Sequence, residues 1–114
     1  MKKLLCLTIV AFVINSCSSP KSLYSWEKYG QASYNYLKKA DEKSIEQIIE
    51  QYRKIIYKQK GTRGMAPPGI HADYGFILIQ QGKLKEGKES LMRETVLYPE
   101  SKIFIDRILT LIEQ

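Results

Sequence analysis

The sequence predicts an all-α domain of about five helices in antiparallel hairpins, preceded by a signal peptide. Apolar residues between Ile45 and Ile56 recur with the period of an amphipathic helix, near 3.6 residues. Proline and glycine, which begin and end helices, divide the chain further on, at 67–69, Gly82 and Pro99. A basic and then apolar N-terminus adds the signal peptide.

Composition limits the size and the chemistry. The chain has 114 residues, enough for one domain, and a formal net charge of +6. That mild excess does not indicate nucleic-acid binding. Cys6 and Cys17 are the only cysteines and His71 is the only histidine, so a metal site and a Cys/His catalytic pair are poorly supplied. We expect no metal, no cofactor and no nucleic acid.

The N-terminus predicts export and a lipid anchor. Its apolar run over 4–14 is too short to span a bilayer, which takes roughly 20 residues. Ile14-Asn15-Ser16-Cys17 resembles the lipobox of bacterial lipoproteins. The resemblance implies a signal peptide over 1–16, cleavage after Ser16 and acylation of Cys17, because only the thiol accepts the diacylglycerol. The alternative is a plain signal peptide cut near Ser19.

The lipobox resemblance also predicts the location. Several acyl chains on one cysteine anchor a protein stably in a membrane. Ser18 follows the cysteine, where an aspartate would indicate retention in the inner membrane. We therefore expect an outer membrane lipoprotein facing the periplasm, with a lipidated tether over 17–22 and a helical domain over 23–114.

The first helix of the body is predicted from Leu23 to about Lys39. Its expected inner face is defined by residues at helical spacing, which are Trp26, Tyr29, Gly30, Ser33 and Leu37. Tyr34 and Tyr36 lie off this face. Most of the tyrosines are expected to pack in the core or at its rim, and the alternative is an aromatic surface that meets a partner.

The second helix is predicted to begin at Asp41 or Ser44 and to end near Lys60, before Gly61. Ser44-x-x-Gln47 fits a capping box. The apolar stripe consists of Ile45, Ile48, Ile49, Tyr52, Ile55 and Ile56. Basic residues without an acid between them follow from Arg53 to Arg63. They are interpreted as a solvated helix end, and contact with anionic lipid is the alternative.

Three more helices are predicted after Pro67-Pro68. The first runs from about Gly69 to Gln81 with Ile70, Tyr74, Gly75 and Leu78 inside. The second runs from Lys83 or Leu84 to Tyr98, between Gly82 and Pro99. The last covers about Glu100 to Glu113, with Phe104, Ile108, Leu111 and Ile112 expected inside.

Residues of the third and fourth helices resemble the tetratricopeptide signature. The matching positions are Tyr74-Gly75, Leu78, Gly82, Leu84, Gly87, Leu91 and Pro99. Gly75 and Gly87 place one small residue on each helix, so we expect the helices to cross closely there. His71 departs from the signature where tryptophan is usual, and Glu94 departs from it where alanine is usual. Trp26-x-x-Tyr29-Gly30 resembles the first half of a degenerate repeat.

Four short motifs together resemble a family of small bacterial lipoproteins known as domain of unknown function 4810. These motifs are Tyr24-Ser25-Trp26, Pro67-Pro68-Gly69, Tyr98-Pro99-Glu100-Ser101 and Phe104-x-Asp106-Arg107. The family has no assigned activity. Its members tend to be encoded beside lipoproteins that resemble the curli secretion channel, which implies a role in an envelope complex.

The sequence shows no phosphate loop, Ser/His/Asp set, metal spacing or acidic pair, and we expect no enzyme and identify no small-molecule substrate. The leading hypothesis is a lipid-anchored periplasmic adaptor that binds a protein partner, such as another envelope lipoprotein. Tyr34, Tyr36 and His71 are the predicted partner-binding residues. The alternative is a structural subunit packed permanently into an outer-membrane assembly, which a large exposed apolar patch would favour.

Overall fold

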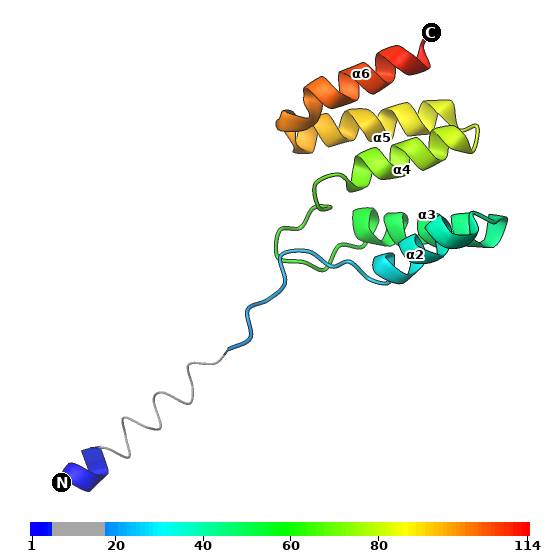
Figure 1. Cartoon of the computed structure of the whole chain (residues 1–114). Helices are drawn as coiled ribbons and strands as arrows, with labels where there is room; N and C mark the ends of the chain where they lie inside the picture. The colour runs from blue at the N-terminus through cyan, green and yellow to red at the C-terminus, as the bar shows by residue number, and fades with distance from the viewer. Residues whose placement is uncertain (6–17) are drawn as a thin grey trace.

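The computed structural model describes residues 1–5 and 18–114, and its folded body is built of helices (Figure 1). In chain order they are α2 (Tyr29–Lys39), α3 (Glu42–Tyr57), α4 (Ile70–Gln80), α5 (Leu84–Leu97), the 3-10 turn η1 (Pro99–Ser101) and α6 (Lys102–Ile112). α2 and α3 form one antiparallel hairpin, α4 and α5 form a second, and α6 lies along α5. The described part of the chain contains no strand. The predicted all-α, tetratricopeptide-like fold is therefore confirmed.

The prediction that the first helix begins at Leu23 is wrong, because α2 begins at Tyr29. Residues 22–26 are not helical and run instead along the loop that follows α3. Thr62 N–H donates to the Ser22 carbonyl at 3.0 Å, and Arg63 N–H donates to the Leu23 carbonyl at 3.1 Å. Ser22, the last residue of the expected tether, is thus already hydrogen-bonded to the body.

The side chain of Gln59 completes this contact. Its Oε1 accepts hydrogen bonds from the Ser25 hydroxyl at 2.8 Å and from Gly61 N–H at 2.9 Å, and also from Ser25 N–H. Its Nε2 donates to the Ser25 carbonyl at 3.3 Å. We refer to residues 22–26 together with 59–63 as the N-terminal clamp. The clamp replaces the hydrogen bonds that a helix from Leu23 would have made.

The predicted inner face of α2 is also wrong in part. Ala32 is the buried residue of this helix, and Tyr29 and Tyr36 pack against the core beside it. Leu37 is 79 % exposed, and a Cβ at Gly30 would meet nothing within 4 Å. The delayed start explains the error, since a face that begins at Trp26 requires a helix that already includes it.

α3 forms largely as its apolar stripe predicted. Ile48, Tyr52 and Ile55 are buried, and the other three stripe residues are half-buried. The carboxylate of Asp41 caps the helix by accepting from Ser44 N–H at 2.8 Å. Of the two predicted starts Asp41 is therefore correct, and the proposed capping box of Ser44 with Gln47 is wrong. The helix ends at Tyr57, before the predicted Lys60, because the residues from Gln59 onward belong to the clamp.

A row of aromatic rings links the clamp to both hairpins. Successive ring centroids are 6.5, 5.7, 5.6 and 5.8 Å apart along Tyr24, Trp26, Tyr29, Tyr52 and Tyr74. These separations lie in the range where aromatic pairs attract each other. Burial raises the pKa of the Tyr52 phenol at the centre of the row. This aromatic row connects side chains of α2, α3 and α4.

The second hairpin agrees closely with the prediction. Its inner face on α4 is buried, as are Gly87 and Leu91 on α5. Gly82 joins the two helices with a positive φ of 79°, a conformation that favours glycine, and Pro99 begins η1. Pro67 is buried before α4 and Pro68 is exposed.

Glu94 caps the start of α4 from the neighbouring helix. Gly69, the N-cap residue, has a φ of 91° and no side chain to offer. The Glu94 carboxylate is 2 % exposed and accepts from Gly69 N–H at 2.6 Å and from Ala72 N–H at 3.3 Å. A carboxylate is favourable at this position, because helix N-termini carry free N–H groups and a partial positive charge. A glutamate therefore stands at position 94, where alanine is usual in the tetratricopeptide signature, because its carboxylate caps α4.

α6 forms where predicted but turns a different face inward. Ile105 is fully buried, while Phe104 and Leu111, both predicted inside, are each 64 % exposed. Ile108 and Ile112, which were also predicted inside, are half-buried. Apolar residues lie all around this helix, so apolar periodicity alone does not predict which of them are buried.

Candidate binding groove between the two hairpins

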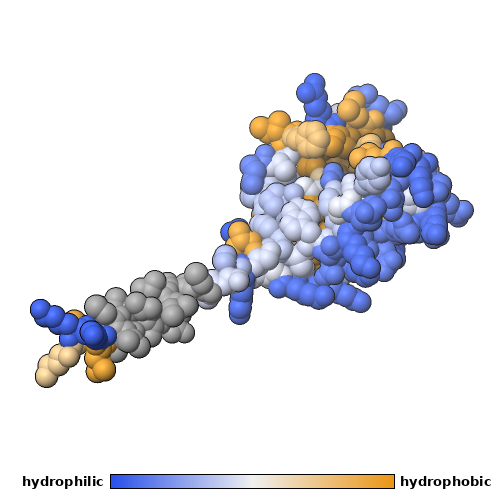
Figure 2. Space-filling model, turned by 60° about the horizontal axis from the view of Figure 1, so that its bottom comes forward, coloured by the Kyte–Doolittle hydropathy of each residue, from blue (hydrophilic) through white to orange (hydrophobic). Residues whose placement is uncertain are grey.

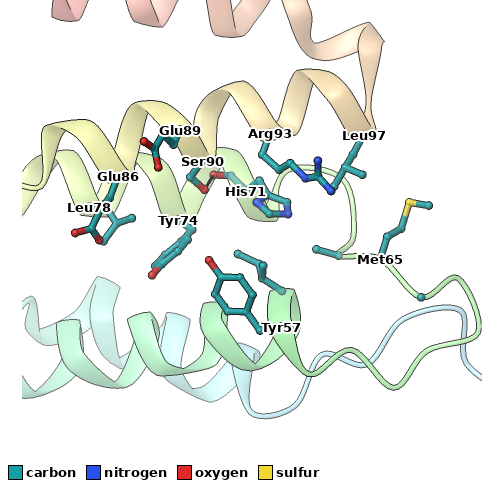
Figure 3. Close-up of a pocket in the computed structure, with 13 residues that line it drawn as sticks. Tyr57, Met65, His71, Tyr74, Leu78, Glu86, Glu89, Ser90, Arg93 and Leu97 are labelled. Carbon is teal, nitrogen blue, oxygen red and sulfur yellow. Dashed lines mark hydrogen bonds between the residues drawn. The ribbon is translucent and has the colours of Figure 1, made fainter.

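An open groove of about 440 Å³ lies between α3 on one side and α4 with α5 on the other (Figure 3). α3 contributes its last turn, the α3–α4 loop closes one end, and α5 forms the opposite wall. Its lining includes Tyr57, Met65, His71, Tyr74, Glu86, Glu89 and Arg93.

The α5 wall carries opposite charges at its two ends. Glu86 and Glu89 lie toward the N-terminus of α5, and Arg93 lies toward its C-terminus, near His71 (Figure 3). The spacings between them, three and four residues, place all three on one side of the helix. An occupant with separated positive and negative groups would therefore bind in one direction.

Tyr57 forms part of the wall opposite α5, and Tyr74 forms part of the floor of the groove. Tyr57, on the last turn of α3, is 73 % exposed and points into the groove from the α3 side. Tyr74 is 5 % exposed, and its hydroxyl accepts a hydrogen bond from Arg53 Nε at 3.2 Å. Tyr57 is the aromatic side chain of the groove with a free surface for a ligand, whereas Tyr74 belongs to the aromatic row.

His71 lies in the floor between α4 and α5. Its side chain is largely buried, with 8 % of the residue exposed, and its carbonyl accepts from the Ser90 hydroxyl at 2.7 Å. Burial lowers the pKa of the imidazole, and the nearby positive charge of Arg93 lowers it further. His71 is thus a neutral, packed side chain at pH 7 in the floor of the groove.

The three predicted partner-binding residues do not share one surface. His71 lines the groove, but Tyr34 and Tyr36 lie on α2, outside it. Tyr34 is 57 % exposed beneath the ammonium of Lys38, 5.6 Å from the ring centroid. Tyr36 packs against the core, and its hydroxyl donates to Gln80 at 3.3 Å.

Sequence reasoning did not find the residues that most expose charge or aromatic surface in the groove. These are Tyr57, Glu86, Glu89 and Arg93. The helical spacing of the three charged residues was a usable signal. Tyr57 carried no signal, because only the packing of α3 against the second hairpin brings it opposite α5.

The described residues contain no group of three or more His, Cys, Asp or Glu side chains that could hold a metal ion. Every buried side-chain nitrogen and oxygen in that part of the chain has a hydrogen-bond partner. No described helix is long and apolar enough to cross a bilayer. Ser16 and Cys17, the predicted cleavage and lipidation sites, lie outside the described residues.

The fold and the groove define a class of protein, a small helical-hairpin domain with an open, charged groove. Residues 23–108 match the model of the family described as domain of unknown function DUF4810, and the chain belongs to that family. No match was found among curated proteins or among solved structures. The family assignment confirms the resemblance carried by the four sequence motifs.

Proposed function

We propose that this protein is a lipid-anchored periplasmic adaptor whose groove binds a segment of a protein partner in a bacterial envelope complex. The observation that carries the proposal is the groove itself, with exposed Tyr57 on one wall and Glu86, Glu89 and Arg93 on the other. Exposed aromatic and arginine side chains are typical of protein interfaces.

The shape and charge of the groove favour a polypeptide ligand. Helical-hairpin grooves accept amphipathic or extended segments. A segment with a basic residue near Glu86 and Glu89 and an acidic residue near Arg93 would complement both ends, with its apolar side chains against Tyr57 and Met65. The expected partners are other envelope lipoproteins, including ones of a secretion-channel-like complex.

Photo-crosslinking in native membranes tests this proposal. A photoreactive residue replaces Tyr57 in the full-length protein, and a matched control replaces Tyr34, which is also exposed but lies outside the groove. We expect one defined crosslinked protein from position 57 and none from position 34. Reversal of the wall charge, by Glu86→Lys with Glu89→Lys, should abolish the crosslink at 57. Equal crosslinking from both positions, or none from either, would refute the groove as the binding site.

Anchoring is a separate part of the proposal and has its own test. Cys17 is the one cysteine of the expected mature chain, so radiolabelled palmitate should label the protein and should not label a Cys17→Ala variant. Fractionation should place the labelled protein with outer membranes. An unlabelled, soluble wild-type protein would show that the lipobox resemblance is misleading.

The exposed face of α6 supports a second candidate function, a subunit packed permanently into an envelope assembly. Ile103 is 87 % exposed, and Phe104 and Leu111 are each 64 % exposed. Figure 2 shows hydrophobic side chains grouped on the side of the body remote from the N-terminal segment. Phe104→Glu should leave the fold intact and disrupt such an assembly, whereas the adaptor proposal expects the Tyr57 crosslink to survive this substitution.

A further inference from the structure

The attachment of the N-terminal segment determines which face of the body lies nearest the anchor. Ser22 and Leu23 are hydrogen-bonded through their carbonyls to Thr62 and Arg63. Only residues 18–21 separate the predicted lipid-bearing Cys17 from this clamp. The five Cα–Cα steps from Cys17 to Ser22 span at most about 18 Å. The clamp of an anchored molecule is therefore confined to the neighbourhood of the bilayer surface.

The clamp carries exposed apolar and aromatic surface. Leu23 is 57 % exposed and Trp26 is 45 % exposed, although Trp26 is also in the aromatic row. Hydrophobic atoms lie beside hydrophilic ones where the N-terminal segment joins the body (Figure 2). Tryptophan is enriched where membrane proteins meet the headgroup region, because its ring is apolar and its N–H is polar.

Basic residues lie within the clamp and next to it in the chain. Lys21 directly precedes the clamp, Arg63 lies within it, and Lys58 is the C-cap residue of α3, one position before residues 59–63; all three are exposed. Lys60 is also in the clamp but forms an ion pair with Glu27 at 3.2 Å. No ion pair involving Lys21, Lys58 or Arg63 is present among the described residues. Three exposed cations thus belong to the clamp or border it in the chain, at the end where the anchor leaves.

We infer that this face, formed by Leu23 and Trp26 with Lys21, Lys58 and Arg63, lies on the surface of an anionic lipid bilayer. The inference rests on the proposed acylation of Cys17. The acyl chains hold the molecule, the cations bind anionic headgroups, and Leu23 and Trp26 enter the interfacial region. The charge of the face favours this occupant over an apolar protein surface, which would leave the cations without counter-charges.

Trp26 is the only tryptophan of the chain, so its fluorescence reports on this face directly. The full-length lipoprotein is reconstituted into vesicles of phosphatidylcholine, or of phosphatidylcholine with phosphatidylglycerol. Each type is prepared with and without brominated acyl chains, which quench tryptophan on contact. We expect quenching about twofold stronger in the anionic vesicles, and a smaller difference at high salt, because salt screens exposed charges.

Two charge variants complete the design. Lys58→Gln with Arg63→Gln should reduce the quenching in anionic vesicles to the neutral-vesicle level. The matched control, Lys43→Gln with Lys85→Gln, removes the same charge from the starts of α3 and α5 and should behave as the wild type. Equal quenching in the two vesicle types, or an equal loss in the control, would overturn the inference.

Flotation of the vesicles separates this inference from the anchoring proposal. A protein that fails to float with neutral vesicles lacks the acyl anchor, and the proposed function then fails together with the inference that rests on it. A protein that floats with both vesicle types but shows no quenching of Trp26 keeps its anchor and overturns only the orientation of the clamp.

Discussion

Gly75 and Gly87 face each other where α4 crosses α5, and each leaves room for the backbone of the other. A Cβ on Gly75 would lie 2.6 Å from the Gly87 carbonyl oxygen, and a Cβ on Gly87 would lie 2.7 Å from the Gly75 carbonyl oxygen. Non-bonded carbon and oxygen atoms do not lie this close together, so neighbouring atoms would have to move to admit the Cβ. The crossing that the two small residues predicted is therefore present, and even an alanine methyl would fit there only if neighbouring atoms moved.

Gly75→Ala or Gly87→Ala should lower the free energy of unfolding by about 1–3 kcal/mol, because the added methyl overpacks a contact between two backbones. Urea denaturation measures the loss. Gly30→Ala is the control, since a Cβ there meets nothing within 4 Å and alanine is the better helix former. A neutral result at both Gly75 and Gly87 would contradict the close crossing.

Glu94→Ala restores the residue usual in the tetratricopeptide signature, yet it should destabilise this protein. Removal of the carboxylate leaves the N–H groups of Gly69 and Ala72 without their acceptor, at a cost of about 1–3 kcal/mol. Glu94→Gln keeps one acceptor oxygen, so its free energy of unfolding should lie between those of the wild type and Glu94→Ala. Glu89→Ala, an exposed position on the same helix, should change the unfolding free energy by less than about 0.5 kcal/mol. A gain in stability at Glu94→Ala would show that the cap is unimportant.

The lowered pKa of His71 predicts acid sensitivity. The unfolded imidazole titrates near 6.5, and the folded one titrates below that value. The unfolded chain therefore binds the proton more readily, and the unfolding free energy falls as the pH drops through 6.5 toward the lower, folded pKa. His71→Gln should remove this part of the slope. Chemical denaturation of both proteins from pH 7.5 to 5 measures the difference, and parallel curves would rule out a buried neutral histidine.

The N-terminal clamp should be a measurable part of the fold. Gln59→Ala removes the acceptor of Ser25 and Gly61 and should cost about 1–3 kcal/mol. Gly61→Ala should displace the same segment, because its Cβ would lie 2.2 Å from the Leu23 carbonyl oxygen. Both variants should shift the emission of Trp26. Thr62→Ala leaves its N–H in place and serves as the control, so an equal effect of Thr62→Ala would count against the clamp.

The inward face of α6 gives a direct comparison of two residues. Ile105→Ala removes a fully buried side chain and should cost about 2–5 kcal/mol. Phe104→Ala removes a larger side chain that is 64 % exposed and should change the unfolding free energy by less than about 0.5 kcal/mol in the isolated protein. Thermal unfolding of both variants measures the two losses of stability. A larger loss for Phe104→Ala than for Ile105→Ala would support the inner face predicted from the sequence.

The groove was only partly predictable. His71 is the single histidine of the chain, and the structure places it in the floor of the groove. Tyr34 and Tyr36 are two residues apart on one helix, so their side chains point in different directions and do not share one surface. The exposure of Tyr57 depends on how far α3 lies from α5, a distance that no local pattern encodes.

The sequence by itself determined the number and kind of helices in the body, the two hairpins and the close crossing at Gly75 and Gly87. These features follow from local causes, namely apolar periodicity, proline and glycine at the breaks, and small residues at helical spacing. Tertiary structure decided the start of α2, the buried face of α6 and the place of Glu94. In each of these cases a distant partner outweighs the local preference. Hydrogen bonds to Gln59 keep residues 22–26 out of a helix. Packing against α5 buries Ile105, although apolar residues lie on every side of α6. The free N–H groups at the start of α4 allow the carboxylate of Glu94 to be buried as a cap.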